Sequence, residues 1–180
     1  MKRSVLHVIC GTVLFCLLSI SAYSATYDVT IQNFSFNPPT LTIAVGDTVK
    51  WTNQASISHT STSGSQCTAD GKWDSGLISS GGIFTHTFTS PGTFPYFCEV
   101  GAHCSSFGMI GVILVNPLLG DINNDGIIDI SDVILVLRMA LKIDPIQPCS
   151  DINNDGVVDI SDVILTLRMA LKLDPLQQCI

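Results

Sequence analysis

The chain has 180 residues, of which 46% are hydrophobic, and it carries a formal net charge of −7 at pH 7. This length accommodates one medium domain or two small ones. The negative charge argues against binding to nucleic acid or to anionic lipid, because both attract basic surfaces.

The N-terminus has the pattern of a secretory signal peptide. Met1-Lys2-Arg3 is basic, Val5 to Ile20 is mostly apolar, and Ala22-Tyr23-Ser24 offers small residues to a signal peptidase. We therefore predict a signal peptide over residues 1–24, cleaved after Ser24, and a secreted or periplasmic protein. No later stretch reads as an apolar helix that could span a bilayer, so no membrane span is expected after cleavage.

Residues 25–116 have the pattern of an all-β domain. Apolar and polar residues alternate over 27–32 and again over 40–45, which predicts half-buried strands. Turn-forming stretches such as Asn37-Pro38-Pro39 and Ser90-Pro91-Gly92 separate these runs at the intervals of a β-sandwich. No helix is predicted before residue 120.

Four side chains of this domain form a candidate metal site. Cys98, His103 and Met109 share one short stretch, and His59 follows the strand-like run that contains Trp51. A thiolate, two imidazoles and a weak thioether are the donors of a trigonal copper site with an axial ligand. We predict one copper ion, bound by His59, Cys98, His103 and Met109.

The remaining histidine of the mature chain is assigned to packing. His86 alternates with Phe84 and Phe88, and no second metal-binding residue stands near it in the sequence. Trp51 and Trp73 are likewise interpreted as core residues.

These motifs resemble the cupredoxin (blue copper, plastocyanin/phytocyanin-like) family from about Thr26 to Val115. Gly46-Asp47-Thr48-Val49-Lys50-Trp51, Trp73-Asp74-Ser75-Gly76-Leu77 and the stretch from Ser90 to Cys98 are similar to its members. The resemblance implies an all-β Greek-key cupredoxin sandwich and a hydrogen bond from the Thr60 N–H to the Cys98 sulfur. One departure is that five residues separate His103 from Met109, one more than we expect from the plant phytocyanins.

Five cysteines remain after signal cleavage, and with Cys98 on copper the other four can pair in three ways. The resemblance to the phytocyanins implies a bridge between Cys67 and Cys104, because that family ties the cysteine beside its loop histidine to one before the Asp-Ser-Gly strand. Cys149 and Cys179 are then left for each other. An oxidising compartment agrees with both bridges.

After a short linker at residues 117–120, the chain repeats itself with an offset of 30 residues. Residues 121–149 match residues 151–179 at all but six positions. Each repeat places oxygen donors with the spacing of an EF-hand-type calcium loop around a required glycine. We predict two calcium ions, one in each repeat. The predicted ligands are Asp121, Asn123, Asp125, Ile127, Asp129 and Asp132, and then Asp151, Asn153, Asp155, Val157, Asp159 and Asp162, with Ile127 and Val157 contributing carbonyl oxygens.

Residues 121–180 resemble the dockerin modules of cellulosomes, because a loop followed by a helix occurs twice with aspartate as the last ligand. The resemblance implies a small α-helical domain of paired EF-hand-type loop-helix units and a cohesin-like partner. The resemblance implies that a cohesin would contact the module at Ile130, Ser131, Ile160 and Ser161. The predicted helix over 132–142 is apolar almost all round, which favours a docking surface. The alternative is that the surplus apolar surface packs on the sandwich.

Together these features favour an exported type 1 (blue) copper electron-transfer protein with a calcium-dependent, dockerin-like docking module. The alternative is a non-redox copper-binding, delivery or adhesion module of an extracellular protein assembly. A thiolate beside two histidines favours electron transfer. No enzyme is predicted, since a catalytic copper would need an open position and usually a further histidine cluster. The sequence does not identify the redox partner.

Overall fold

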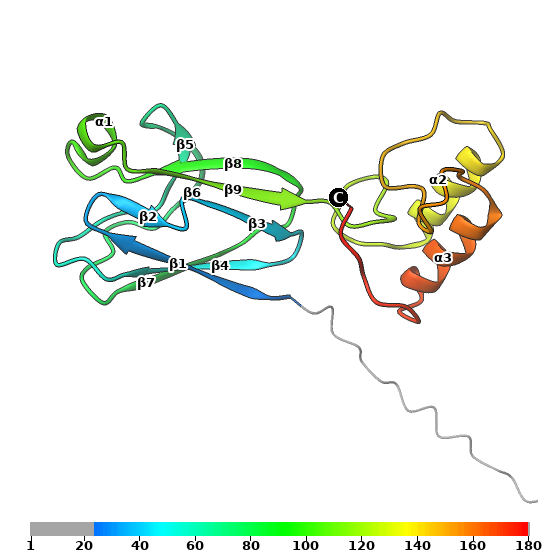
Figure 1. Ribbon diagram of the computed structural model, residues 1–180, viewed down its shortest axis with the longest axis horizontal. Helices are drawn as coiled ribbons and strands as arrows, with labels where there is room; N and C mark the ends of the chain where they lie inside the picture. Colours follow the sequence, from blue (N-terminus) through cyan, green and yellow to red (C-terminus); the bar gives the residue numbers. More distant parts are fainter. Residues whose placement is uncertain (1–23, 180) are drawn as a thin grey trace, which may run out of the picture.

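The computed structural model describes residues 24–179. The predicted signal peptide, apart from Ser24, lies outside the described residues, as does Ile180. A β-sandwich occupies one end of the long axis and two helices the other, joined by a short segment after β9 (Figure 1). Within residues 24–179, no helix is both long enough and apolar enough to cross a membrane.

The sandwich consists of a four-stranded and a five-stranded sheet. The first has the order β2 (Ser35–Asn37), β1 (Thr26–Gln32), β4 (Thr48–Asn53), β7 (Ile83–Thr87). The second has the order β3 (Thr40–Ala44), β9 (Ile110–Asn116), β8 (Gly92–Phe97), β5 (Thr62–Ser65), β6 (Thr68–Asp74). β1 with β4 and β3 with β9 are parallel, and the other named pairs are antiparallel. The predicted β-sandwich is confirmed.

The core lies between the sheets, where the two-residue period places every second side chain. In β4, Val49, Trp51 and Asn53 are buried, and the residues between them are half-buried. The rings of Trp51 and Trp73 lie 6.1 Å apart, so both tryptophans are core residues, as predicted. His86 is half-buried and stacks on Trp73 at 5.0 Å, which confirms its packing role. Burial lowers the pKa of His86.

One helix falls before residue 120, where none was predicted. α1 (His103–Phe107) has five residues, too few for a helical period to be visible in the sequence. It ends at Gly108, which adopts the left-handed conformation with φ of +65° and donates its N–H to the Cys104 carbonyl. The bridge between Cys67 and Cys104 ties this helix to the turn between β5 and β6.

The C-terminal part is a two-helix region. α2 (Ile130–Ala140) and α3 (Ile160–Ala170) each begin with a reciprocal cap in which two aspartates accept backbone N–H groups. At α2, Asp129 accepts from Ser131 at 2.7 Å and Asp132 accepts from Asp129 at 3.0 Å. The helices share a small apolar cluster, to which α2 contributes Val133, Val136 and Met139.

The segment between the two parts is tied down by hydrogen bonds. The Leu119 N–H donates to the Gln177 carbonyl at 2.7 Å, and the Cys179 N–H donates to the Pro117 carbonyl at 3.0 Å. Leu118 is buried in the same cluster as the sandwich core. The connection is therefore structured along its length.

The two repeats differ in what their loops touch. A Cβ atom placed on Gly126 would lie 2.9 Å from Val45 Cγ1 and 3.0 Å from the Thr89 carbonyl oxygen, both in the sandwich. A Cβ on the equivalent Gly156 would meet nothing within 4 Å. The first loop therefore packs on the sandwich, and the corresponding glycine of the second loop is open.

This difference predicts unequal effects of one substitution at two matched positions. Gly126 and Gly156 have φ of +87° and +88°, so alanine is strained equally at both. Only Gly126→Ala also forces a close contact with the sandwich, and overpacking of this kind costs about 1–3 kcal/mol. We expect Gly126→Ala to lower the free energy of unfolding of the helices by about 1–3 kcal/mol more than Gly156→Ala does. Circular dichroism in urea measures this difference. Equal losses would contradict the packing of the first loop on the sandwich.

Candidate metal centre

His59 lies in the loop between β4 and β5, and Asn53 shapes this loop. The buried Asn53 amide donates to the carbonyls of Ile57 and Ile78, both at 2.8 Å. The backbones of His59 and Ile78 pair in both directions, at 3.1 and 2.8 Å. The loop thus holds His59 fully buried at one end of the sandwich.

The other three predicted ligands lie between β8 and β9. Cys98 follows β8, His103 opens α1, and Met109 precedes β9. The Cys98 N–H donates to the Met109 carbonyl at 3.1 Å, and the Met109 N–H donates to the His103 carbonyl at 3.0 Å. Cys98 and Met109 are fully buried, and His103 is half-buried. The loop closes on itself and leaves His103 as its ligand nearest to solvent.

The two histidines present the same ring atom to the sulfur. His59 Nδ1 lies 3.6 Å and His103 Nδ1 3.3 Å from Cys98 Sγ. These donor atoms all lie within 4.8 Å of one another, and no second such group of His, Cys, Asp or Glu occurs in residues 24–179. Cys98 is the free cysteine of this part of the chain. The structure therefore brings together the donor atoms of His59, Cys98 and His103, and it places the backbone of Met109 against Cys98 and His103.

The surroundings of Cys98 and His59 favour metal binding. The Thr60 N–H donates to Cys98 Sγ at 3.3 Å, as the family resemblance implied. Thr60 Oγ1 accepts the Glu99 N–H at 2.7 Å, which joins the two ligand loops. Burial lowers the pKa of His59, and the nearby His103 lowers it further. His59 is thereby kept neutral, the form that binds a metal ion.

The donor set fits copper. Thiolate and imidazole donors with a thioether nearby suit copper, whereas calcium and magnesium prefer oxygen ligands. Nε2 of His59 is buried without a hydrogen-bond partner, so in the described structure this ring has its polar contact through Nδ1, at the sulfur. Nδ1 is therefore the ring nitrogen that faces the sulfur and would bind the ion.

Both predicted disulfides are confirmed. Cys67 is bonded to Cys104 and Cys149 to Cys179. The first bridge fixes the residue next to His103, so it holds a ligand loop whether or not a metal is bound. The second joins the ends of the two repeats.

The predicted calcium ligands lie in the two loops that precede α2 and α3, and the last ligand of each set, Asp132 or Asp162, lies in the first turn of the helix. In the first loop, the Asp121 carboxylate accepts the N–H groups of Asp125 and Gly126, and Asp132 accepts that of Ile122. Asp121 and Asp132 are almost completely buried. Burial raises the pKa of Asp121, and the carboxylates of Asp132 and Asp125 raise it further. The second loop repeats these bonds, with Asp151 accepting from Asp155 and Gly156.

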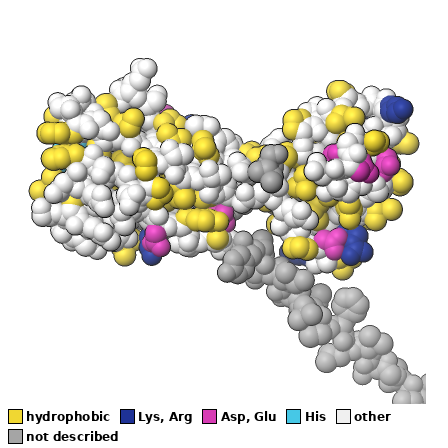
Figure 2. Space-filling view, viewed as in Figure 1, with side chains coloured by type: hydrophobic (Ala, Val, Ile, Leu, Met, Phe, Trp, Pro, Cys, Tyr) yellow, Lys and Arg dark blue, Asp and Glu magenta, His cyan; other side chains and the backbone are white. Residues whose placement is uncertain are grey.

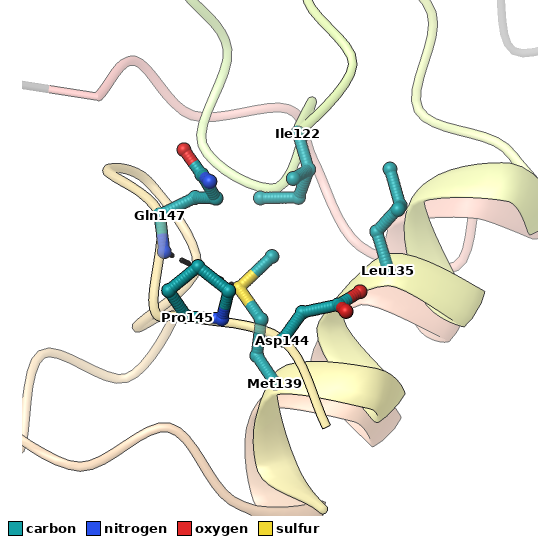
Figure 3. Close-up of a pocket in the computed structure, with 6 residues that line it drawn as sticks. All are labelled: Ile122, Leu135, Met139, Asp144, Pro145 and Gln147. Carbon is teal, nitrogen blue, oxygen red and sulfur yellow. Dashed lines mark hydrogen bonds between the residues drawn. The ribbon is translucent and has the colours of Figure 1, made fainter. Parts of the chain in front are cut away.

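A hollow in the first repeat offers no comparable metal site (Figure 3). Its single carboxylate, Asp144, is paired with Arg138 at 2.6 Å. Two of its lining residues are joined by a hydrogen bond, which the Gln147 N–H donates to Met139 Sδ at 3.3 Å. The hollow is lined by Ile122, Leu135, Met139, Asp144, Pro145 and Gln147.

Three contributors to the copper end were not anticipated. Asn53 and the Thr60 hydroxyl hold the ligand loops, and Phe34 lies beside His103. Asn53 is the last residue of β4, where buried and half-buried residues alternate. A polar residue at a buried position of this pattern indicates a side chain that holds the following loop. Phe34 sits in a turn, and nothing in its sequence context points to the metal site.

Comparison with known proteins agrees with this geometry. Residues 23–116 match the model of the family described as copper binding proteins, plastocyanin/azurin family. A purple cupredoxin from Nitrosopumilus maritimus is 26% identical, with 49% of this chain and 97% of that chain covered and a TM-score of 0.43. A reduced tryptophan-to-tyrosine mutant of amicyanin is 23% identical, with coverage of 50% and 81% and a TM-score of 0.42.

The assignment rests on the family model, which covers just over half of the chain. It agrees with the donor atoms of His59, Cys98 and His103, which converge at one end of the sandwich, and with the buried Met109, whose backbone bonds to both Cys98 and His103. The family match ends at residue 116, before the helical region. The chain therefore belongs to the plastocyanin/azurin family of copper-binding proteins, with a type 1 copper site at His59, Cys98, His103 and Met109.

Proposed function

We propose that this protein is an exported electron carrier whose C-terminal region binds calcium and docks onto a cohesin-like partner. Export rests on the predicted signal peptide, and it agrees with the two disulfides, which persist in oxidising compartments. Copper in this site would supply a one-electron Cu(II)/Cu(I) couple. The observation that carries the redox role is the buried Cys98 sulfur facing Nδ1 of both histidines.

The protein's contribution to electron transfer is rigidity. Asn53 fixes the loop of His59, and the disulfide at Cys104 fixes the loop of His103. Ligands held in this way cannot easily rearrange when the charge of the site changes. A storage or delivery protein would instead need a more open site, and the full burial of Cys98 and His59 argues against that role.

The axial ligand provides a test of the redox role. Met109→Leu keeps the side-chain volume at a fully buried position, so the loss of stability should be below about 1.5 kcal/mol. Because the thioether is only a weak donor, the protein should stay blue and its reduction potential should rise. Voltammetry and a visible spectrum measure both. Loss of all colour would contradict an axial role for Met109.

Calcium binding is supported by the electrostatics of the two loops. Asp121, Asp132 and Asp162 are almost completely buried, and burial together with the nearby carboxylates of Asp132 and Asp125 raises the pKa of Asp121. A divalent cation would offset this repulsion and satisfy the oxygen atoms that backbone N–H groups leave free. The left-handed glycines, Gly126 and Gly156, make the sharp turn that such loops require.

A docking role is supported by apolar surface that the sandwich leaves uncovered. Ile130 and Ile160 are each 61% exposed, and Ile134 and Ile164 on the same helices are about half exposed. Figure 2 shows hydrophobic side chains at several places on the helical region. Some apolar residues, including Ile128 and Ile152, do join the sandwich core cluster. The exposed remainder favours a partner protein, since large apolar surfaces usually mark interfaces.

A further inference from the structure

Two phenylalanine rings lie against the most exposed copper ligand. The Phe34 ring meets the His103 imidazole edge to face, with 4.9 Å between ring centroids. The Phe34 ring also stacks on the Phe107 ring, with 4.1 Å between centroids. Phe34 also lies 6.3 Å from His59, again edge to face. The two phenylalanines thus lie at the surface beside the copper ligands, and the Phe107 side chain is 57% exposed.

Phe34 holds this position in an unfavourable backbone conformation. It lies in the turn between β1 and β2, with φ of +63°. A bulky residue seldom adopts positive φ, and such turn positions usually take glycine or asparagine. Backbone strain of this kind tends to persist at functional sites, where surrounding contacts maintain it. The aromatic contacts of Phe34 are to His103, Phe107 and His59.

Phe107 is placed by the helix that begins with His103. It lies four residues later in α1, and side chains at that spacing share one helix face. The backbone of His103 is held by its bonds to Val100 and Met109. These backbone bonds do not restrain the imidazole about its side-chain torsions. The ring itself contacts Cys98 Sγ through Nδ1 at 3.3 Å and lies 4.8 Å from the His59 ring, and Phe34, backed by Phe107, contacts it at 4.9 Å.

We propose that Phe34 and Phe107 form a two-ring clamp that positions the His103 imidazole with Nδ1 toward the Cys98 sulfur. Neither residue binds the metal, so both are positioning residues. The clamp restricts rotation of His103 in both oxidation states and shields one face of the ring from water. The inference rests on the electron-transfer role proposed for the copper site and is independent of the role proposed for the helices.

The first test measures how fast copper leaves the full-length protein for a chelator in excess. Phe34→Ala and Phe107→Ala should each accelerate release roughly 3- to 10-fold, the range expected for one lost aromatic contact. Phe94→Ala is the matched control, because Phe94 is half-buried and packs on Phe88 at 5.2 Å, away from the ligands. The double variant should release copper little faster than either single one, because the two rings act as a unit. Release as slow as in Phe94→Ala would overturn the clamp.

A second variant separates positioning from general stability. Phe34→Gly relieves the positive-φ strain, so it should melt at a higher temperature than Phe34→Ala while releasing copper equally fast. In the copper-free protein, proton NMR should show that the His103 ring signals lose their ring-current shift in Phe34→Gly. If release followed melting temperature across the variants, or if the His103 signals did not move, the clamp would be wrong. The proposed electron transfer would stand in either case as long as the variants remain blue.

Discussion

Cys98→Ser should abolish the blue colour of the copper-loaded protein. The intense visible band of such a site comes from the thiolate bonded to copper, and a serine hydroxyl stays protonated and is a poor copper ligand. Changes that only disturb the partners of a ligand already weaken metal binding by about 10- to 100-fold, so losing the ligand itself should weaken it more. A visible spectrum and a copper titration of the variant measure both effects.

The fold should survive this substitution. The serine oxygen can still accept the Thr60 N–H that now bonds to Cys98 Sγ, so the buried donor keeps a partner. Met109→Leu is the matched control, because it alters an equally buried ligand and should keep its colour. A Cys98→Ser protein that stayed blue would refute the copper site. Finding Cys98 in a disulfide in freshly isolated protein would do the same.

Chelating calcium should unfold α2 and α3 and leave the blue sandwich intact. Residues 121–180 contain ten aspartates and four basic side chains, a net charge of −6. Two calcium ions would reduce this charge to −2. Their binding energy becomes folding energy, about 4 kcal/mol for each site when free calcium is 1,000 times the dissociation constant. Circular dichroism at 222 nm and the visible band report the two parts separately.

The same preparation tests the proposed partner. With calcium present, an immobilised cohesin domain should retain the protein, and a chelator should release it. Replacing Ile130 and Ile160 together with aspartate should abolish retention without changing the helical signal, because both side chains are more than half exposed. If helicity did not depend on calcium and no cohesin bound, the region would be a calcium-independent appendage of its sandwich.

The copper ligands could be predicted from the sequence because their chemistry is local. Cys98, His103 and Met109 share one loop, and few metals other than copper suit a thiolate with imidazole and thioether. His59 required the additional knowledge that its strand ends beside that loop, which the family resemblance supplied. The bridge of Cys67 with Cys104 came from the same resemblance.

The supporting contacts could not be predicted in this way. Phe34 reaches His103 across almost seventy residues of chain, through a turn that sequence rules would assign to glycine or asparagine. The helix at His103 is a single turn, too short for its period to be read. The two loops are nearly identical in sequence, so no local pattern reveals that Gly126 meets Val45 while Gly156 is open.

The hydrogen-bonded connection at 117–120 bears on how a docked carrier would exchange electrons. The copper ligands lie at the end of the sandwich opposite to the helices, and the chain passes between the two parts through Leu118, which is buried (Figure 1). A flexible linker lets the attached domain sample many positions, whereas a rigid linker holds the domain at one distance and angle. Within an assembly, the copper site would have a very high effective concentration at a redox protein that lies at the matching distance and angle. At a redox protein placed elsewhere, its effective concentration would be close to zero. Geometry of attachment would then select the electron partner as much as surface chemistry does.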